Sequence, residues 1–144
     1  MHEYLPFLLS TTLVAQAPKM DEATRQAIQA TAMDYIEGWY EGDASRMERA
    51  IHPDLAKRIV MPQPDGLPRV EHMGAQHLVQ MARSAYGKHT PKENQEKVVQ
   101  ILDVFGKAAS VKITAADWVD YLHLGFVNGH WVIVNVLWEL KPRG

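Results

Sequence analysis

An Asn-Gly pair between two apolar runs constrains the fold of this chain more than any other feature of its sequence. Asn128 and Gly129 separate the run 109–127 from the run 130–140, and both runs are rich in Val, Ile, Trp and Tyr. Because both central residues of a type I′ turn need positive φ, which Asn and Gly tolerate, the pair predicts a two-residue β-hairpin turn. Such a turn sets the register, with Val127 opposite His130.

Counting outward from this turn assigns the side chains of the hairpin to two faces. The register pairs Leu124 with Ile133, Leu122 with Asn135, and Asp120 with Leu137. One face then collects Trp118, Asp120, Leu122, Leu124, Trp131, Ile133, Asn135 and Leu137. The other face, which carries Tyr121 and His123, is also mostly apolar. A sheet that is apolar on both faces buries one against helices and the other against a second subunit, which predicts a homodimer through the outer face.

The N-terminal part of the chain has helical periodicity. Ile28, Ala32, Tyr35, Ile36 and Trp39 recur at three- and four-residue steps, which predicts a long helix over 21–40. A short second helix follows, ended by a proline, and an amphipathic pattern predicts a third helix over 74–86.

The strand runs 97–105, 109–127 and 130–140 follow the third helix. A chain in which the helices come first and a strand meander comes last is typical of the α+β class. We therefore expect a curved antiparallel sheet wrapped over about three N-terminal helices.

Length and composition limit the function. A chain of 144 residues has room for one domain, expected over 20–144. The 15 basic and 17 acidic residues are interspersed, so nucleic acid is not an expected partner. The chain has no cysteine, and its seven histidines show no metal-ligand spacing, so we expect no metal. It carries no phosphate loop and no apolar run long enough to span a membrane, and no cofactor is expected.

The first nineteen residues allow two interpretations. The segment 4–17 is apolar, carries no charge and ends in Ala15-Gln16-Ala17, a pattern that signal peptidases accept. It lacks the positive start of an export signal, however, so residues 1–19 are either such a signal or an N-terminal arm. The protein is accordingly cytoplasmic, or exported to the periplasm if residues 1–17 act as a signal.

Three segments together resemble a known superfamily. They are DYIEGWYEGD at 34–43, MERAIHPDLAKR at 47–58 and DWVDYLHLGFVNGHWVIVNVLWEL at 117–140. They resemble the nuclear transport factor 2-like superfamily, which has a cystatin-like fold, and within it the branch named putative lumazine-binding, near the SnoaL-like polyketide cyclases. The likeness covers about residues 21–141. It implies a cone-shaped sheet, a long first helix across the mouth of the cone, a pocket between helices and sheet, and usually a dimer.

The first candidate for catalysis is Asp120, because the register aims it at an apolar face where its pKa would rise and it could act as an acid or base. The alternative is a structural carboxylate near the sheet rim. Asn135 either orients a ligand carbonyl or bonds a neighbouring side chain. His52, beside the end of the second helix, either lies at the pocket mouth as a proton donor or caps that helix. The expected pocket consists of Tyr35, Trp39, Trp118, Leu122, Ile133, Asn135 and Leu137.

Three functions remain open at this point, because the same fold serves both enzymes and non-enzymatic proteins. The first is binding of a small hydrophobic molecule in an apolar pocket, without catalysis. The second is an isomerase, dehydratase or cyclase that uses an acid-base carboxylate on a hydrophobic cyclic substrate. The third is a structural dimerisation module whose cone is filled by side chains.

Overall fold

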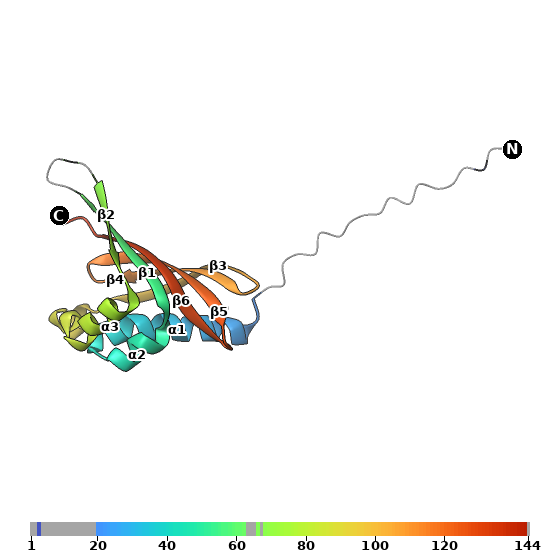
Figure 1. Ribbon diagram of the computed structural model, residues 1–144, viewed down its shortest axis with the longest axis horizontal. Coiled ribbons are helices and arrows are strands. Elements are labelled where there is room, and N and C mark those ends of the chain that lie inside the picture. Colours follow the sequence, from blue (N-terminus) through green and yellow to red (C-terminus); the bar gives the residue numbers. More distant parts are fainter. Residues whose placement is uncertain (1–2, 4–19, 63–65, 67, 144) are drawn as a thin grey trace.

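The computed structural model describes residues 3, 20–62, 66 and 68–143. The two alternatives for residues 1–19, an export signal or an arm, lie outside the described residues apart from Glu3. In the described part, the helices lie on one side of a curved six-stranded sheet, as Figure 1 shows. The expected α+β class is confirmed.

Two capped helices begin the domain. Helix α1 runs over Glu22–Glu41; the side chain of Asp21 caps it by accepting from the Thr24 amide at 2.7 Å. Gly42 ends α1 with φ of 67°, a left-handed conformation that glycine adopts without strain. Helix α2 spans Ala44–Ala50 and is capped by Asp43 in the same way.

The third helix is followed by two short 3₁₀ turns, which close the helical side of the domain. Helix α3 runs over Ala75–Arg83, η1 over Tyr86–His89 and η2 over Lys92–Asn94. Gly87 in η1 lies so close to α1 that a Cβ at this position would be 2.1 Å from the carbonyl oxygen of Trp39. Only glycine allows this approach, which holds η1 against the helix.

The sheet has the strand order β2-β1-β6-β5-β4-β3. Its strands are β1 (Ile51–Pro62), β2 (Pro68–Met73), β3 (Lys97–Phe105), β4 (Ala108–Ala115), β5 (Trp118–Val127) and β6 (His130–Leu140). All neighbours are antiparallel except β1 and β6, which run parallel, so the sheet is mixed. The run 109–127 forms two strands, because the chain bends at Ala116 and Asp117.

The predicted turn is present at Asn128 and Gly129, which have φ of 50° and 84°. Val127 pairs with His130 and Leu124 with Ile133, as expected from the turn type. Beyond this point the register shifts by one residue, because β6 carries a bulge at Val134, the residue left without a partner.

The bulge exchanges the faces of the remaining part of β6. His123 pairs with Asn135, Tyr121 with Leu137 and Asp120 with Trp138. The predicted pairing of Asp120 with Leu137 is therefore wrong, and Asn135 and Leu137 do not share the face of Asp120. An extra residue in a strand moves every following side chain to the opposite face.

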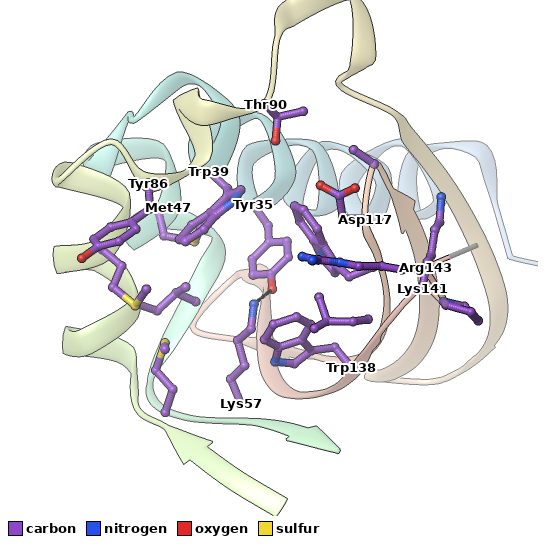
Figure 2. A pocket seen from close by; sticks show the side chains of 17 residues that line it. Tyr35, Trp39, Met47, Lys57, Tyr86, Thr90, Asp117, Trp138, Lys141 and Arg143 are labelled. Atoms are coloured by element: carbon purple, nitrogen blue, oxygen red, sulfur yellow. Dashed lines mark hydrogen bonds between the residues drawn. The ribbon is translucent and has the colours of Figure 1, made fainter. Parts of the chain in front are cut away.

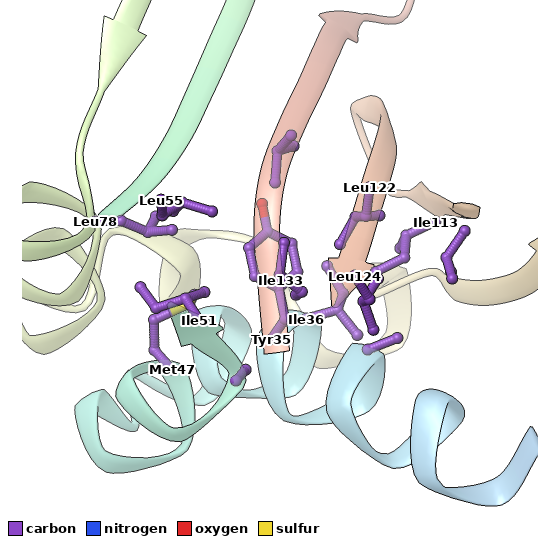
Figure 3. Packing of buried hydrophobic residues seen from close by; sticks show 14 of the residues in the cluster. Tyr35, Ile36, Met47, Ile51, Leu55, Leu78, Ile113, Leu122, Leu124 and Ile133 are labelled. Carbon is purple, nitrogen blue, oxygen red and sulfur yellow. The ribbon is translucent and has the colours of Figure 1, made fainter. Parts of the chain in front are cut away.

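The hydrophobic core lies between α1 and the concave face of the sheet (Figure 3). Ile36 from α1 packs there with Ile113, Leu122, Leu124 and Ile133, all at most 2% exposed. The core occupies one part of the space between helices and sheet.

Candidate functional site

A cavity of about 820 Å³ opens between the helices and the concave face of the sheet (Figure 2). Ligand sites in proteins usually range from about 300 to 1,000 Å³. The lining residues are Tyr35, Trp39, Met47, Lys57, Met73, Leu78, Met81, Tyr86, Thr90, Ala116, Asp117, Trp118, Trp138, Leu140, Lys141, Pro142 and Arg143. Most of them are apolar or aromatic, with charged side chains at a few points only.

Lys57 contributes a buried amine to this cavity. It occupies an inward position of β1 and is 8% exposed. Its Nζ donates a hydrogen bond to the hydroxyl group of Tyr35, which comes from α1 and is 2% exposed. The same nitrogen lies 5.0 Å from the ring centre of Tyr35 and 5.1 Å from that of Trp138, so both rings can stabilise its positive charge.

Asp120 lies close to this pair and is fully buried. One carboxylate oxygen, Oδ2, accepts a hydrogen bond of 2.8 Å from the indole Nε1 of Trp118. The other, Oδ1, is buried and has no hydrogen-bond partner among the described residues. A buried carboxylate oxygen without a partner is costly, and such an atom often marks a functional group.

Burial perturbs the protonation of all three groups. It raises the pKa of Asp120 above its ordinary 3.8, and the Lys57 charge and the Trp118 hydrogen bond offset part of this rise. Burial lowers the pKa of Lys57 from 10.5, an effect that the charge of Asp120 opposes. Burial also raises the pKa of Tyr35 well above 10.0, and the charge of Asp120 adds to this rise. The charge of Asp120 therefore influences the protonation of both Lys57 and Tyr35.

Aromatic contacts hold Trp118 in place at the cavity. Its ring centre lies 5.9 Å from that of Tyr40 and 6.4 Å from that of Trp138. Tyr40 itself is fixed, since its hydroxyl donates to the Glu96 carbonyl at 2.7 Å and accepts from the Ala116 amide at 3.0 Å. This chain of contacts runs from α1 to the beginning of β5 and makes the indole of Trp118 a rigid donor to Asp120.

Several residues predicted for the site lie at or near the cavity. Tyr35, Trp39 and Trp118 line it. Asp120 is on the same side of the sheet but lies behind the lining, in contact with Trp118. Leu122 and Ile133 belong to the buried core and do not line the cavity.

Other predicted site residues lie elsewhere. Asn135 bonds its amide nitrogen to Nδ1 of His123 at 3.3 Å on the outer face, where Leu137 is 44% exposed. His52 does not end a helix: α2 stops at Ala50, and His52 lies in β1, where its Nδ1 accepts from the Asp54 amide at 2.9 Å. It does not line the cavity. The helix ends early because Ile51 is extended, with φ of −116° and ψ of 148°.

Lys57 and Trp138 are two of the cavity residues that the sequence interpretation missed. Trp138 follows the bulge in β6, so a regular register counted from the turn would place it on the face opposite to Asp120. Lys57 carried a detectable signal, since it stands between Leu55 and Ile59 in an alternating strand and so shares their face. A charged residue at an inward strand position is unusual and indicates a functional or paired group.

The described residues contain no cluster of three His, Asp or Glu side chains that could hold a metal ion. Nor does any helix in this part of the chain have the length and apolarity needed to cross a membrane.

The fold defines a class of proteins. An NTF2-like protein of unknown function from Shewanella baltica shares 22% sequence identity, with 84% of this chain and 96% of that one covered and a TM-score of 0.67. Another from Methylobacillus flagellatus shares 17% identity over 86% and 97% of the two chains, also with a TM-score of 0.67. A ketosteroid isomerase-like protein from Erwinia carotovora atroseptica shares 14% sequence identity, with 82% of this chain and 96% of that one covered and a TM-score of 0.54. At these identities the similarity shows the fold alone: the chain has the fold of the NTF2-like proteins.

The family is narrower than the fold class. Residues 23–139 match the family described as putative lumazine-binding, and the chain belongs to that family. Among curated proteins, none matches this chain.

Proposed function

We propose that this protein binds a compact, planar organic molecule in the cavity between its helices and its sheet. The observation that carries this proposal is the cavity of about 820 Å³, with the buried Lys57–Tyr35 pair in its wall. A buried amine at the edge of an open cavity is costly for stability, and ligand sites typically combine an apolar wall with a few such polar groups. A dimerisation module with a filled cone would need neither feature.

The shape of the ligand follows from the aromatic walls. Indole rings of Trp39, Trp118 and Trp138 border the cavity together with Tyr35 (Figure 2). Flat rings favour stacking and edge contacts with another flat ring system. The description of the family names lumazine, a planar bicyclic heterocycle, and a molecule of that kind is compatible with these walls.

A second candidate function is proton-transfer catalysis on a hydrophobic cyclic substrate, as in a SnoaL-like isomerase, dehydratase or cyclase. The observation in its favour is Oδ1 of Asp120, a buried carboxylate oxygen without a partner. In this reaction Asp120, which lies behind the cavity lining, would take or return a proton through a bridging water, and the Tyr35 hydroxyl with Lys57 would polarise a substrate oxygen. Trp118 would hold the carboxylate in position through its bond to Oδ2.

A thermal-shift screen tests the binding proposal. Lumazine, flavin-like, steroid-like and polyketide-like compounds are added to the wild-type protein and to Trp39→Ala, which removes one wall. We expect planar compounds to raise the melting temperature of the wild type and to have a smaller effect on the variant. If no compound raises the melting temperature, the binding proposal is wrong.

The two candidates are distinguished by turnover. Any compound found in the screen is incubated with wild-type protein and with Asp120→Asn, and the products are separated by chromatography. Conversion by the wild type and not by Asp120→Asn supports catalysis; recovery of unchanged compound in both supports binding alone.

We also propose that the protein forms a homodimer through the outer face of the sheet. Tyr121 and Leu137, directly paired across β5 and β6, are 49% and 44% exposed there, and a groove of about 390 Å³ lies beside them. Exposed apolar side chains next to a groove are typical of subunit contacts. Light scattering on the wild type and on Leu137→Lys tests this: a dimer that becomes a monomer supports the proposal, and a wild-type monomer contradicts it.

A further inference from the structure

The Lys57–Tyr35 pair has unused hydrogen-bond donors that can bond to a ligand in the cavity. The Lys57 ammonium has three N–H groups, of which one is used for Tyr35. Tyr35 accepts that bond and keeps its own O–H for donation, since no other hydrogen bond of this hydroxyl exists in the described part of the chain. Both residues line the cavity. A ligand atom that satisfies these remaining N–H and O–H groups must therefore be a hydrogen-bond acceptor.

The positive charge of Lys57 is not neutralised by direct contact. The ion pairs among the described residues join other side chains and leave Lys57 out. Asp120 influences Lys57 electrostatically, but its carboxylate bonds to Trp118. Buried lysines are rare unless they are paired, so a position for an anionic partner is open on the cavity side.

The aromatic walls do not make this a site for a cation. Aromatic cages recognise ammonium ligands because the ring faces attract positive charge. Here Lys57 itself lies over the rings of Tyr35 and Trp138, at 5.0 and 5.1 Å. The protein therefore supplies the cation of the cage, and a positively charged ligand would be repelled by it.

Positively charged side chains outnumber negatively charged ones among the residues that line the cavity. Lys57, Lys141 and Arg143 are cationic and Asp117 is the one carboxylate among the lining residues, so three positive charges face one negative charge. Lys141 shares its charge with Glu96, whose carboxylate lies 3.0 Å away. In Figure 2, Lys141 and Arg143 lie on the side of the cavity opposite Trp39 and Tyr86.

From these contacts we infer that the ligand is a planar acid, whose anionic oxygen is received by Nζ of Lys57 and the hydroxyl of Tyr35 while its rings pack against the tryptophans. This inference rests on the proposed function and names its ligand class: an aromatic carboxylate or a ring that carries an ionised oxygen. Charge-assisted hydrogen bonds of this kind are about twice as strong as neutral ones.

Three probes of nearly equal size test the charge preference: naphthoate, naphthamide and naphthylmethylamine, which differ in being anionic, neutral and cationic. Their dissociation constants are measured by calorimetry on the wild-type protein at neutral pH. We expect naphthoate to bind about tenfold more tightly than naphthamide, and the amine to bind most weakly. Equal binding of naphthoate and naphthamide, or a preference for the amine, overturns the inference.

Variants test whether Lys57 and Tyr35 cause the preference for the anionic probe. Lys57→Met keeps the length of the side chain without its charge, and we expect it to remove the preference for naphthoate while naphthamide still binds. Tyr35→Phe should lose part of the preference. Lys107→Met, an exposed lysine in the turn between β3 and β4, is the matched control and should bind all three probes like the wild type. If Lys57→Met keeps the preference, the inference is wrong.

The same measurements separate this inference from the proposed function. If none of the three probes binds the wild type, the proposal of a cavity for planar molecules fails. If all three bind with equal affinity, the cavity accepts planar molecules and only the assignment of an anionic ligand fails. Because this comparison uses the wild type, it does not depend on whether Lys57→Met folds.

Discussion

Lys57 of β1 and Tyr35 of α1 are 22 positions apart in the chain and are joined by a buried hydrogen bond from an ammonium group to a phenol. Tyr35 also belongs to the buried hydrophobic cluster, and each of the two side chains carries a polar group into the interior. The bond connects the long helix to the strand that follows α2, at the wall of the cavity. Its position links the fold to the proposed ligand site.

The stability of the protein should depend on the protonation of Asp120. The pKa of this carboxyl is raised in the folded state by burial, so the folded protein binds the proton more tightly than the unfolded chain does. Lowering the pH from neutral toward the ordinary value of 3.8 should therefore stabilise the wild type relative to Asp120→Asn, which has no proton to gain. Urea denaturation of both proteins at several pH values measures the difference. A difference that is constant with pH, or that favours Asp120→Asn in acid, contradicts the prediction.

Trp118→Phe should destabilise the protein by about 1.5–3 kcal/mol at neutral pH, because it removes the donor to a buried carboxylate. It should also raise the pKa of Asp120 further, since the Trp118 hydrogen bond lowers it. Trp39→Phe is the control: it makes the same change at another cavity residue, whose indole N–H has no hydrogen bond within the described residues. The control should lose less than about 1 kcal/mol. Equal losses would mean that ring size, and not the hydrogen bond, is responsible.

Gly87→Ala should destabilise the protein by at least about 2 kcal/mol, because the new Cβ would lie 2.1 Å from the Trp39 carbonyl oxygen and 2.6 Å from its carbon. The contact is with backbone, so η1 and α1 must separate. Since Trp39 and Tyr86 belong to these elements and line the cavity, binding of planar compounds should weaken as well. Gly74→Ala, where nothing lies within 4 Å of the added Cβ, is the control and should cost less than about 1 kcal/mol.

Arg46 holds α1 and α2 together. Its guanidinium bonds the carboxylates of Asp34 and Glu37, both at 3.0 Å, and these three side chains are 19–24% exposed. Arg46→Met should lower the free energy of unfolding by about 1–2 kcal/mol, since it removes charge-assisted hydrogen bonds to two partly buried acids. Asp34 keeps its ion pair with Arg49 and Glu37 keeps its ion pair with Lys97, which limits the loss. Arg25→Met breaks an exposed pair with Glu22 and should change the free energy of unfolding much less, because solvent screens exposed ion pairs. Guanidinium denaturation would obscure the comparison through its own salt, so urea is the suitable denaturant.

The parts of the fold that could be predicted depend on local chemistry. Gly42 and Asp43 have cap functions that are determined by a few neighbouring residues, and the boundary between α1 and α2 follows from them. The turn at Asn128 and Gly129 is equally local, and it correctly set the pairs nearest to it. The register failed only where an extra residue entered β6. Nothing in the apolar run around Val134 distinguishes a bulged strand from a regular one.

The site could be predicted only in part, because it depends on strands that are far apart in the chain and neighbours in the sheet. The facing of the strand that carries Lys57 depends on its parallel pairing with β6, where Lys57 lies opposite Val136. Parallel neighbours far apart in the chain leave no turn signal. Tyr35 and Trp39 were found because helix periodicity gives the buried face directly, whereas Asn135 was assigned to the wrong face by the missing bulge.

The parallel pairing of β1 with β6 has a consequence for how the molecule is made. During synthesis β1 leaves the ribosome long before β6, so the lysine it carries stays hydrated until the last strand of the sheet arrives beside it. The amine loses its water only when the nascent domain is nearly finished. Folding and maturation of the ligand pocket should therefore coincide in one late step.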